Sequence, residues 1–166
     1  MEYNIRLMVE NDYESVKNIF LQAIDSKIVT FHTEAPSYED WDKAHINECR
    51  FVAVDKNDSV IGWIALSPTS NRYVYRGVLD ISIYLDSAHR GKHIGTELLN
   101  KVIHESEKIG IWTLQSGIFE INEASIALHK KCGFRILGVR ERVGQDMDGY
   151  WQNTVIMERR SKVCGV

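Results

Sequence analysis

The chain has no long apolar run, no leader-like N-terminus and few cysteines. Its 166 residues contain no stretch near the ~20 apolar residues that span a bilayer. The first residues, MEYNIRLMVEND, lack the basic and apolar regions of a signal peptide. The three cysteines are odd in number and form no Cys-x-x-Cys pair, which argues against a disulfide framework. We therefore expect a cytoplasmic protein with no membrane partner.

The chain also lacks a strong excess of either charge. A net charge of −3 argues against nucleic acid or an acidic membrane as a general partner. The sequence shows no repeat or low-complexity tract, and its only prolines are Pro36 and Pro68. A chain of this length without a linker predicts one domain, which we place at residues 1–160, followed by a tail at 161–166.

Hydrophobic periodicity predicts an α/β (α+β) domain with one mixed central sheet flanked by helices. Apolar and alternating runs predict strands over Tyr3–Leu7, Phe51–Val54, Val60–Leu66, Val78–Leu85, Ile111–Ile118, Phe134–Val143 and Tyr150–Glu158. Capping residues before apolar stripes predict a helix after Asn11 or Asp12, and further helices over Ser37–Asn47, Ile94–Lys108 and Asn122–Lys131. The expected order is β-α-α-β-β-β-α-β-α-β-β.

A glycine-bracketed basic loop, Arg90–Gly95 (RGKHIG), follows the Val78–Leu85 strand and opens a helix. A helix start offers unpaired N–H groups and a positive dipole, and two glycines let the backbone approach an anion closely. The loop matches neither the dinucleotide fingerprint nor the P-loop. It therefore predicts a site for an anion such as a pyrophosphate. The alternative is a loop that only turns the chain, with Arg90 and Lys92 in solvent.

The whole pattern resembles the GCN5-related N-acetyltransferases. The family shows Arg/Gln-x-x-Gly-x-Gly/Ala after a central strand and a later Asn…Gly-Phe segment, which here is Asn122–Phe134 (NEASIALHKKCGF). More narrowly, the chain resembles the phosphinothricin and methionine sulfoximine acetyltransferase branch. The matching pieces are Thr33–Trp41, Tyr75–Leu85, Arg90–Gly95, Gly110–Phe119 and Gly149–Arg160. The resemblance implies transfer of an acetyl group from acetyl-CoA to a small amino-acid-like amine.

The resemblance also implies where acetyl-CoA is held. Backbone groups of Ile83, Tyr84 and Leu85 would pair with the pantetheine, as if it were one more strand. The pyrophosphate would meet the N–H groups of Arg90, Gly91, Lys92, His93, Ile94, Gly95 and Thr96. Asn122 and Ser125 would contact the pantetheine or its phosphates, although Asn122 also suits a plain helix N-cap.

His93 departs from the usual family loop, RGKGIG, which has a glycine at this position. If the position requires a positive φ, histidine costs on the order of 1 kcal/mol there. If it does not, His93 faces solvent or the 3′-phosphate of CoA. Its backbone N–H is kept in either case, so we expect cofactor binding to persist.

Asp80, a carboxylate within the apolar run VLDISIYL, needs a partner or a role, and the resemblance implies that it is the general base. The family usually carries glutamate here, one methylene longer. Burial would raise the pKa of the aspartate toward that of the amine, or a water would relay the proton. The alternative is a structural aspartate paired with a loop arginine such as Arg76.

His129 stands where many relatives carry a tyrosine that serves as the acid for the departing CoA thiolate. A neutral imidazole there could donate a proton or orient a water. The alternative is a histidine that packs near the end of its helix.

Loop residues are expected to select the amine. An arginine fork suits a carboxylate or phosphinate, and rings of Phe31, Tyr73, Tyr75 and Trp151 would form an aromatic wall. The expected substrate-binding positions are Phe31, Thr33, Glu34, Arg72, Tyr73, Tyr75, Arg76, Val78 and Leu79. Taken alone, each arginine could be a solvated surface charge. Many relatives have a basic residue or histidine at the position of Gln152, after the tryptophan that Trp151 matches, so the identity of the exact substrate stays open.

The partner we expect is a small-molecule amine, with a homodimer implied by the resemblance. We expect no metal, because His89 and His93 lack a third ligand. One alternative is acetylation of another amine, such as a protein N-terminus, a polyamine or an antibiotic. A different class is a non-catalytic acetyl-CoA-binding module.

Overall fold

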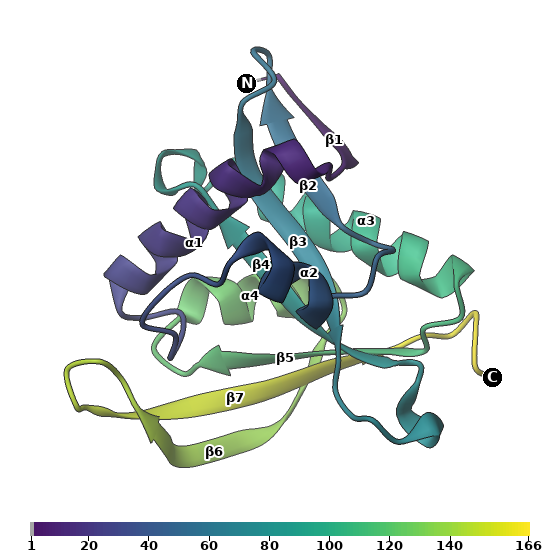
Figure 1. Ribbon diagram of the computed structural model, residues 1–166. Helices are drawn as coiled ribbons and strands as arrows, with labels where there is room; N and C mark the ends of the chain where they lie inside the picture. Colours follow the sequence, from purple (N-terminus) through teal and green to yellow (C-terminus); the bar gives the residue numbers. More distant parts are fainter. Residues whose placement is uncertain (1) are drawn as a thin grey trace.

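The computed structural model describes residues 2–166 and has the predicted element order (Figure 1). The strands are β1 (Tyr3–Leu7), β2 (Phe51–Asp55), β3 (Val60–Pro68), β4 (Val78–Leu85), β5 (Thr113–Phe119), β6 (Arg135–Gln145) and β7 (Trp151–Arg160). The helices are α1 (Tyr13–Ser26), α2 (Tyr38–Ala44), α3 (Ile94–Lys108) and α4 (Glu123–Lys131), with short 3-10 turns η1 (Glu10–Asp12), η2 (Tyr73–Tyr75) and η3 (Ser87–His89). Within the described residues, no helix is both long and apolar enough to cross a membrane.

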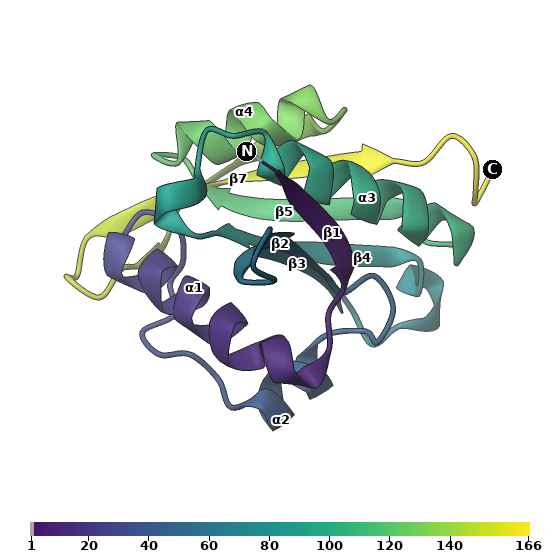
Figure 2. The ribbon, with the colours of Figure 1, turned by 90° about the horizontal axis from the view of Figure 1, so that it is seen from above.

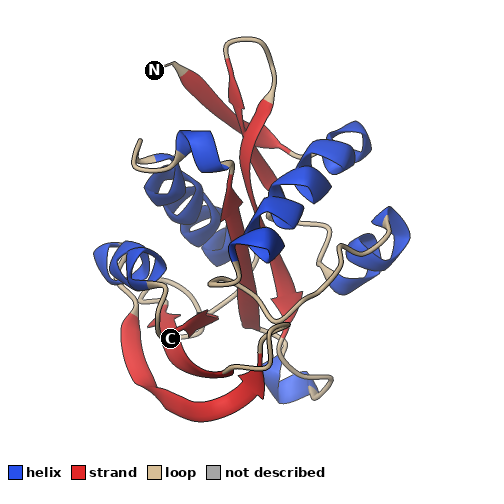
Figure 3. Ribbon diagram, turned by 90° about the vertical axis from the view of Figure 1, so that its left-hand side faces the viewer, coloured by secondary structure: helices blue, strands red, loops and turns tan. Residues whose placement is uncertain are grey.

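The seven strands form one sheet in the order β1-β2-β3-β4-β5-β7-β6. All neighbouring strands are antiparallel except β4 and β5, which are parallel. Figure 2 shows α3 and α4 on one face of the sheet and α1 and α2 on the other, and Figure 3 shows helices on both sides of the strands. This is the mixed α/β architecture that the sequence predicts.

Each face of the sheet has its own apolar core. The core under α3 includes Leu98, Leu99 and Val102, which share one stripe of that helix and are fully buried. The core under α1 includes Val16 and Phe20, which pack on the opposite face. Burying such stripes is the main source of stability for helices of this length.

Strands β4 and β5 pair over only a short stretch. Their register joins Val78 to Thr113, Leu79 to Leu114 and Asp80 to Gln115, and no pairing continues beyond this point. Both strands run on, β4 to Leu85 and β5 to Phe119. The two strands therefore part immediately after Asp80, and main-chain groups on the facing edges past that position have no strand partner.

Helix α2 ends earlier than predicted. Ser37 caps its start as expected, since its hydroxyl accepts from the N–H of Asp40 at 3.2 Å. The helix stops at Ala44 rather than Asn47, because His45 takes an extended conformation. The His45 ring donates from Nδ1 to the carbonyl of Trp41 at 2.7 Å and satisfies one of the free carbonyls of the last turn.

Residues 161–166 lie against the rest of the chain. The Arg160 guanidinium donates from Nη1 to the carbonyls of Trp112, Ser161 and Cys164 at 3.3, 2.9 and 3.2 Å. The Cys164 thiol donates to the carbonyl of Ile111 at 3.1 Å. The segment beyond β7 is thus tied to the start of β5.

Candidate functional site

The start of α3 has the backbone geometry expected for the anion site that the sequence predicts. Gly91 has φ +74° and His93, the N-cap residue, has φ +64°, so the chain turns twice through left-handed backbone before the helix begins. No side chain caps the helix at His93. The first-turn N–H groups of a helix have no intrahelical acceptor, so those at Ile94, Gly95 and Thr96 are free to meet an anion.

The left-handed conformation of His93 leads to a prediction about stability. Glycine adopts this conformation without a Cβ clash, whereas other residues lose about 1–2 kcal/mol, partly offset by the greater unfolded-state entropy of glycine. We expect His93→Gly to raise the free energy of unfolding by up to about 1 kcal/mol in urea denaturation. His93→Ala, which removes the ring but keeps the strain, is the control. Equal effects of the two variants would assign the change to the side chain instead.

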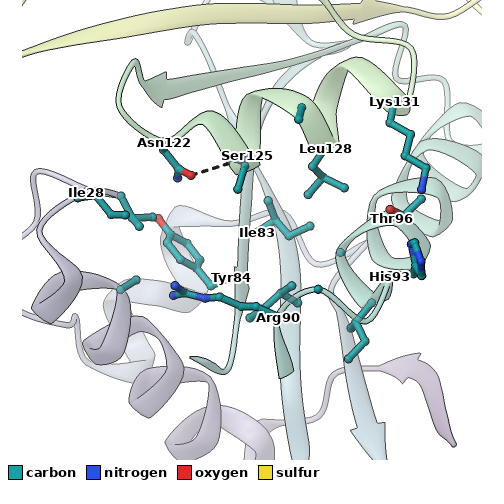
Figure 4. A pocket seen from close by; sticks show the side chains of 18 residues that line it. Ile28, Ile83, Tyr84, Arg90, His93, Thr96, Asn122, Ser125, Leu128 and Lys131 are labelled. Carbon is teal, nitrogen blue, oxygen red and sulfur yellow. Dashed lines mark hydrogen bonds between the residues drawn. The ribbon is translucent and has the colours of Figure 1, made fainter. Parts of the chain in front are cut away.

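A cavity of about 480 Å³ adjoins this helix start (Figure 4). On one side it is bounded by β4 beyond the point where β4 leaves β5, and on the other by α4, which follows β5. The expected cofactor positions that line it are Ile83, Tyr84, Leu85, Arg90, Gly91, His93, Ile94, Gly95, Thr96, Asn122 and Ser125. Lys92 does not line the cavity, because its ammonium turns back to the carbonyl of Ala88 at 2.9 Å.

Further residues line the cavity that the sequence reasoning did not single out. They are Ala23, Ile28, Val29, Ala124, Ala127, Leu128 and Lys131. Those on α4 (Ala124, Ala127, Leu128 and Lys131) lie at helical spacing from one another, so the face of that helix was available as a signal. Those on α1 and in the loop after it come from a distant part of the sequence. Local pattern gives no sign that this loop crosses the end of β4.

Asn122 is the N-cap of α4, which is the alternative role that the sequence suggested for it. Its side-chain oxygen accepts from the N–H of Ser125 at 3.2 Å, the dashed contact in Figure 4. Both side chains still border the cavity. The cap therefore fixes the first turn of α4 against the cavity.

Tyr84 contributes its ring as well as its backbone. The ring packs against Phe20 and Trp63, with 5.0 Å between centroids in each case, and lies beside Ile28 in Figure 4. Burial raises the pKa of Tyr84 to about 12, although contact with the Thr30 side chain acts in the other direction. The phenol is therefore neutral near pH 7 and forms an uncharged wall.

Asp80 occupies the last position of β4 that pairs with β5, where the sheet opens. It is half-buried, and this burial raises the pKa of its carboxyl group above the usual range, while the Gln115 side chain partly offsets the effect. The alternative partner, Arg76, makes no ion pair with it among residues 2–166. That alternative is wrong, because Arg76 instead lies over the rings of Tyr73 and Trp112, with its Cζ 4.2 and 5.1 Å from their centroids.

His129 lies inside the core and does not line the cavity. Its Nδ1 donates to the carbonyl of Ser125 at 2.8 Å, so Nε2 is the unprotonated nitrogen of the neutral ring. Burial lowers the pKa of His129, and the ring packs edge-on against Phe134 at 5.1 Å. Within the described chain Nε2 has no hydrogen-bond partner. This geometry favours the packing role given above as the alternative.

The expected substrate residues do not gather in the cavity. Phe31, Thr33 and Glu34 are exposed in the loop after α1, and Phe31 packs on Phe119 with 4.5 Å between ring centroids. The positions around η2 form a second exposed group, made of Arg72, Tyr73, Tyr75 and Arg76. Val78 is half-buried at the start of β4. Leu79 is buried in the α3-side core, which contradicts a substrate contact through its side chain.

The rings of the expected aromatic wall do not stack on one another. The rings of Phe31, Tyr73, Tyr75 and Trp151 make no aromatic pair with one another in the described part of the chain. The Arg72 Cζ lies 5.5 Å from the ring centroid of Tyr75, and the Arg142 Cζ lies 5.5 Å from that of Trp151. The aromatic wall stays a prediction.

Comparison with known proteins identifies close matches in sequence and in structure. Residues 16–134 match the model of the Acetyltransferase (GNAT) family. The chain is 34% identical over 160 residues to YwnH of Bacillus subtilis (strain 168), provisionally named a phosphinothricin acetyltransferase, with 93% of this chain and 97% of that protein covered. It is 32% identical over 107 residues to the L-methionine sulfoximine/L-methionine sulfone acetyltransferase of Pseudomonas aeruginosa, with 64% and 62% covered.

Among solved structures, a GNAT superfamily phosphinothricin acetyltransferase from Sinorhizobium meliloti, in complex with AcCoA, superposes with a TM-score of 0.90. Its sequence is 28% identical, and the match covers 99% of this chain and 91% of that one. This chain therefore shares its strand order and domain length with a protein whose structure contains acetyl-CoA.

Proposed function

Since the chain belongs to the acetyltransferase (GNAT) family and is an acetyl-CoA-dependent N-acetyltransferase, we propose that its acceptor is a small amino-acid-like amine. The acceptors we favour are of the phosphinothricin and methionine sulfoximine type, by similarity to the named relatives. The observation that carries the proposal is the parting of β4 and β5 directly after Asp80, beside a helix start suited to phosphate.

The chemistry of the cavity suits two parts of acetyl-CoA, its phosphates and its pantetheine. Free N–H groups at the start of α3, with Arg90 and Lys131 at the rim, suit the negative phosphates. The unpaired edge of β4 over Ile83–Leu85 suits the amides of pantetheine, which can add to a sheet edge as an extra strand. This placement brings the thioester toward Asp80, where the strands separate.

Asp80 is the proposed base. An ammonium group must lose a proton before its nitrogen can attack the thioester carbon. A carboxylate whose pKa is raised by burial accepts that proton more readily than an ordinary aspartate. The attack forms the new C–N bond, and the C–S bond then breaks to release the CoA thiolate. A backbone N–H near Ile83 would stabilise the oxyanion formed in between.

The proton for the thiolate is proposed to come from water. The His129 ring is neutral, and its Nδ1–H already serves the carbonyl of Ser125. The role of this residue is then to pack α4 against the core through the ring of Phe134. Holding the amine and the thioester together in one complex supplies the remaining rate enhancement.

The arginines near η2 are the proposed anion clamp. Neither Arg72 nor Arg76 forms an ion pair among residues 2–166. Nη1 of Arg76 donates to the carbonyl of Tyr73 at 3.3 Å, and its other N–H groups and those of Arg72 are proposed to bind a carboxylate or phosphinate. Stacking on Tyr75 and Tyr73 orients these side chains in advance.

We also propose a homodimer. Strand β6 pairs only with β7 and is exposed along its length. Exposed apolar side chains on the two strands are Ile136, Leu137, Val139, Val143 and Trp151. Long exposed edge strands are covered in most native proteins. We expect light scattering to give twice the mass of one chain, and a monomer at micromolar concentration would contradict this.

The function is tested by thiol release from acetyl-CoA against a panel of amines. The panel contains methionine sulfoximine, methionine sulfone, phosphinothricin, a polyamine, an aminoglycoside and a peptide with a free N-terminus. Turnover with the sulfoximine, the sulfone or phosphinothricin alone is the expected result. Turnover only with a different amine would overturn the substrate class. CoA binding without turnover on any amine would favour a non-catalytic module.

A further inference from the structure

One carboxamide ties the β4–α3 loop to α1. Gln22 donates from Nε2 to Oδ2 of Asp86 at 2.9 Å, and its Oε1 accepts from the N–H of Ser87 at 2.8 Å. Gln22 is half-buried on α1 and directly precedes Ala23, which lines the cavity. A single side chain thus meets both a carboxylate and a main-chain donor at the point where the loop leaves the sheet.

Asp86 passes this restraint along the loop. Its N–H donates to the carbonyl of Ile61 at 3.0 Å, which anchors the residue to β3. Its Oδ1 accepts from the N–H of Ala88 at 3.0 Å and from Nδ1 of His89 at 2.7 Å. These hydrogen bonds fix the turn η3, and Arg90 directly follows this turn.

The rest of the loop has few restraints of its own. Gly91 would meet no atom within 4 Å even if it carried a Cβ, and Lys92 bonds only to Ala88 within the loop. In the described part of the chain, Gln22 makes the one hydrogen-bonded tie between residues 87–92 and another element. A glycine-containing loop that is not ordered beforehand must be ordered by its ligand, which weakens binding.

We infer that Gln22 is a positioning residue that orders the pyrophosphate-binding loop before acetyl-CoA arrives. This inference rests on the proposed placement of acetyl-CoA at the start of α3. Gln22 itself does not line the cavity, so it acts through Asp86 and Ser87. Its removal should weaken the phosphate end of the ligand and leave the pantetheine end unchanged.

The test compares CoA and pantetheine binding to wild type and Gln22→Ala. We expect isothermal titration calorimetry to show CoA binding about tenfold weaker for the variant, the size of effect expected from lost preorganisation. Pantetheine, which lacks the pyrophosphate and adenosine, should bind both proteins equally in a titration followed by NMR. Asp25→Ala on the same helix is the matched control, because Asp25 is exposed and makes no ion pair within residues 2–166.

A second variant protects the test against general destabilisation. Gln22→Glu keeps the shape and an acceptor for Ser87, but it replaces the donor to Asp86 with a repelling carboxylate. We expect it to bind CoA at least as weakly as the alanine variant at neutral pH, with thermal melting confirming that both are folded. Unchanged CoA affinity in Gln22→Ala, or an equal loss for pantetheine, would overturn the inference. Failure of wild type to bind CoA would overturn the proposed function and the inference with it.

Discussion

Asp80→Asn is expected to lower kcat by about 10²- to 10⁴-fold, the range for removal of a positioned base. Asparagine has nearly the same shape but cannot accept the ammonium proton. The residue does not line the cavity, so CoA affinity should not change. Steady-state thiol release with the best amine of the panel gives kcat, and calorimetry gives the CoA affinity.

Asp80→Glu is the control for this substitution. It restores a carboxylate with one more methylene, and we expect it to retain far more activity than the asparagine variant. Turnover by Asp80→Asn at the wild-type rate would remove Asp80 from the role of base. Loss of CoA binding in the same variant would instead indicate that the parting of β4 and β5 had been disturbed.

The pH profile gives an independent check on the same group. The base acts in its ionised form, so kcat/KM should fall as pH drops through the pKa of Asp80. Because burial raises that pKa, this acid limb should lie above the pH expected for an ordinary aspartate near 3.9. Asp80→Asn should lose the limb, leaving only the dependence that comes from the amine.

Gly95→Val is expected to weaken CoA binding at least tenfold and to destabilise the fold by about 1–3 kcal/mol, the usual range for overpacking. Gly95 is buried in the first turn of α3, where an added Cβ would lie 3.1 Å from Cδ2 of Leu128 and 3.4 Å from Cδ1 of Leu85. A valine would therefore push α3 away from α4 and displace the N–H groups that face the cavity. Calorimetry with CoA and urea denaturation measure the two effects.

Gly138→Val is the matched control for Gly95→Val. Gly138 lies on β6, where an added Cβ would meet nothing within 4 Å, and its φ is not positive. We expect it to leave CoA binding unchanged. CoA affinity in Gly95→Val equal to that of the control would show that the first turn of α3 does not contact the ligand.

The sequence was sufficient for the elements that depend on local pattern. The β4 strand and α3 have their predicted bounds, Val78–Leu85 and Ile94–Lys108, because a continuous apolar strand and a clean helical stripe leave little ambiguity. The end of α2 was misplaced, because it depends on a contact between the His45 ring and a carbonyl of the previous turn. Helix ends decided by a single side chain are not visible in periodicity.

The two parts of the candidate site differ in the same way. The cofactor positions cluster because they follow one strand, one loop and two helix starts, all of which have local signatures. The expected amine positions come from the loop after α1 and from η2, and whether such loops meet depends on packing over long sequence distances. His93 lies between these cases. The sequence shows that histidine replaces the usual glycine, but only the folded backbone shows that φ is positive at this residue.

If acetyl-CoA binds where β4 and β5 part, the stability of this chain would depend on the concentration of acetyl-CoA around it. A ligand that fits between the strands only when the chain is folded adds RT ln(1 + [L]/Kd) to the free energy of unfolding, about 2.7 kcal/mol at one hundred times Kd. In the proposed placement, acetyl-CoA would pair with the edge of β4 beyond Asp80, where the pairing of β4 with β5 ends. The folded population, and with it resistance to proteolysis, would then rise and fall with the supply of acetyl-CoA.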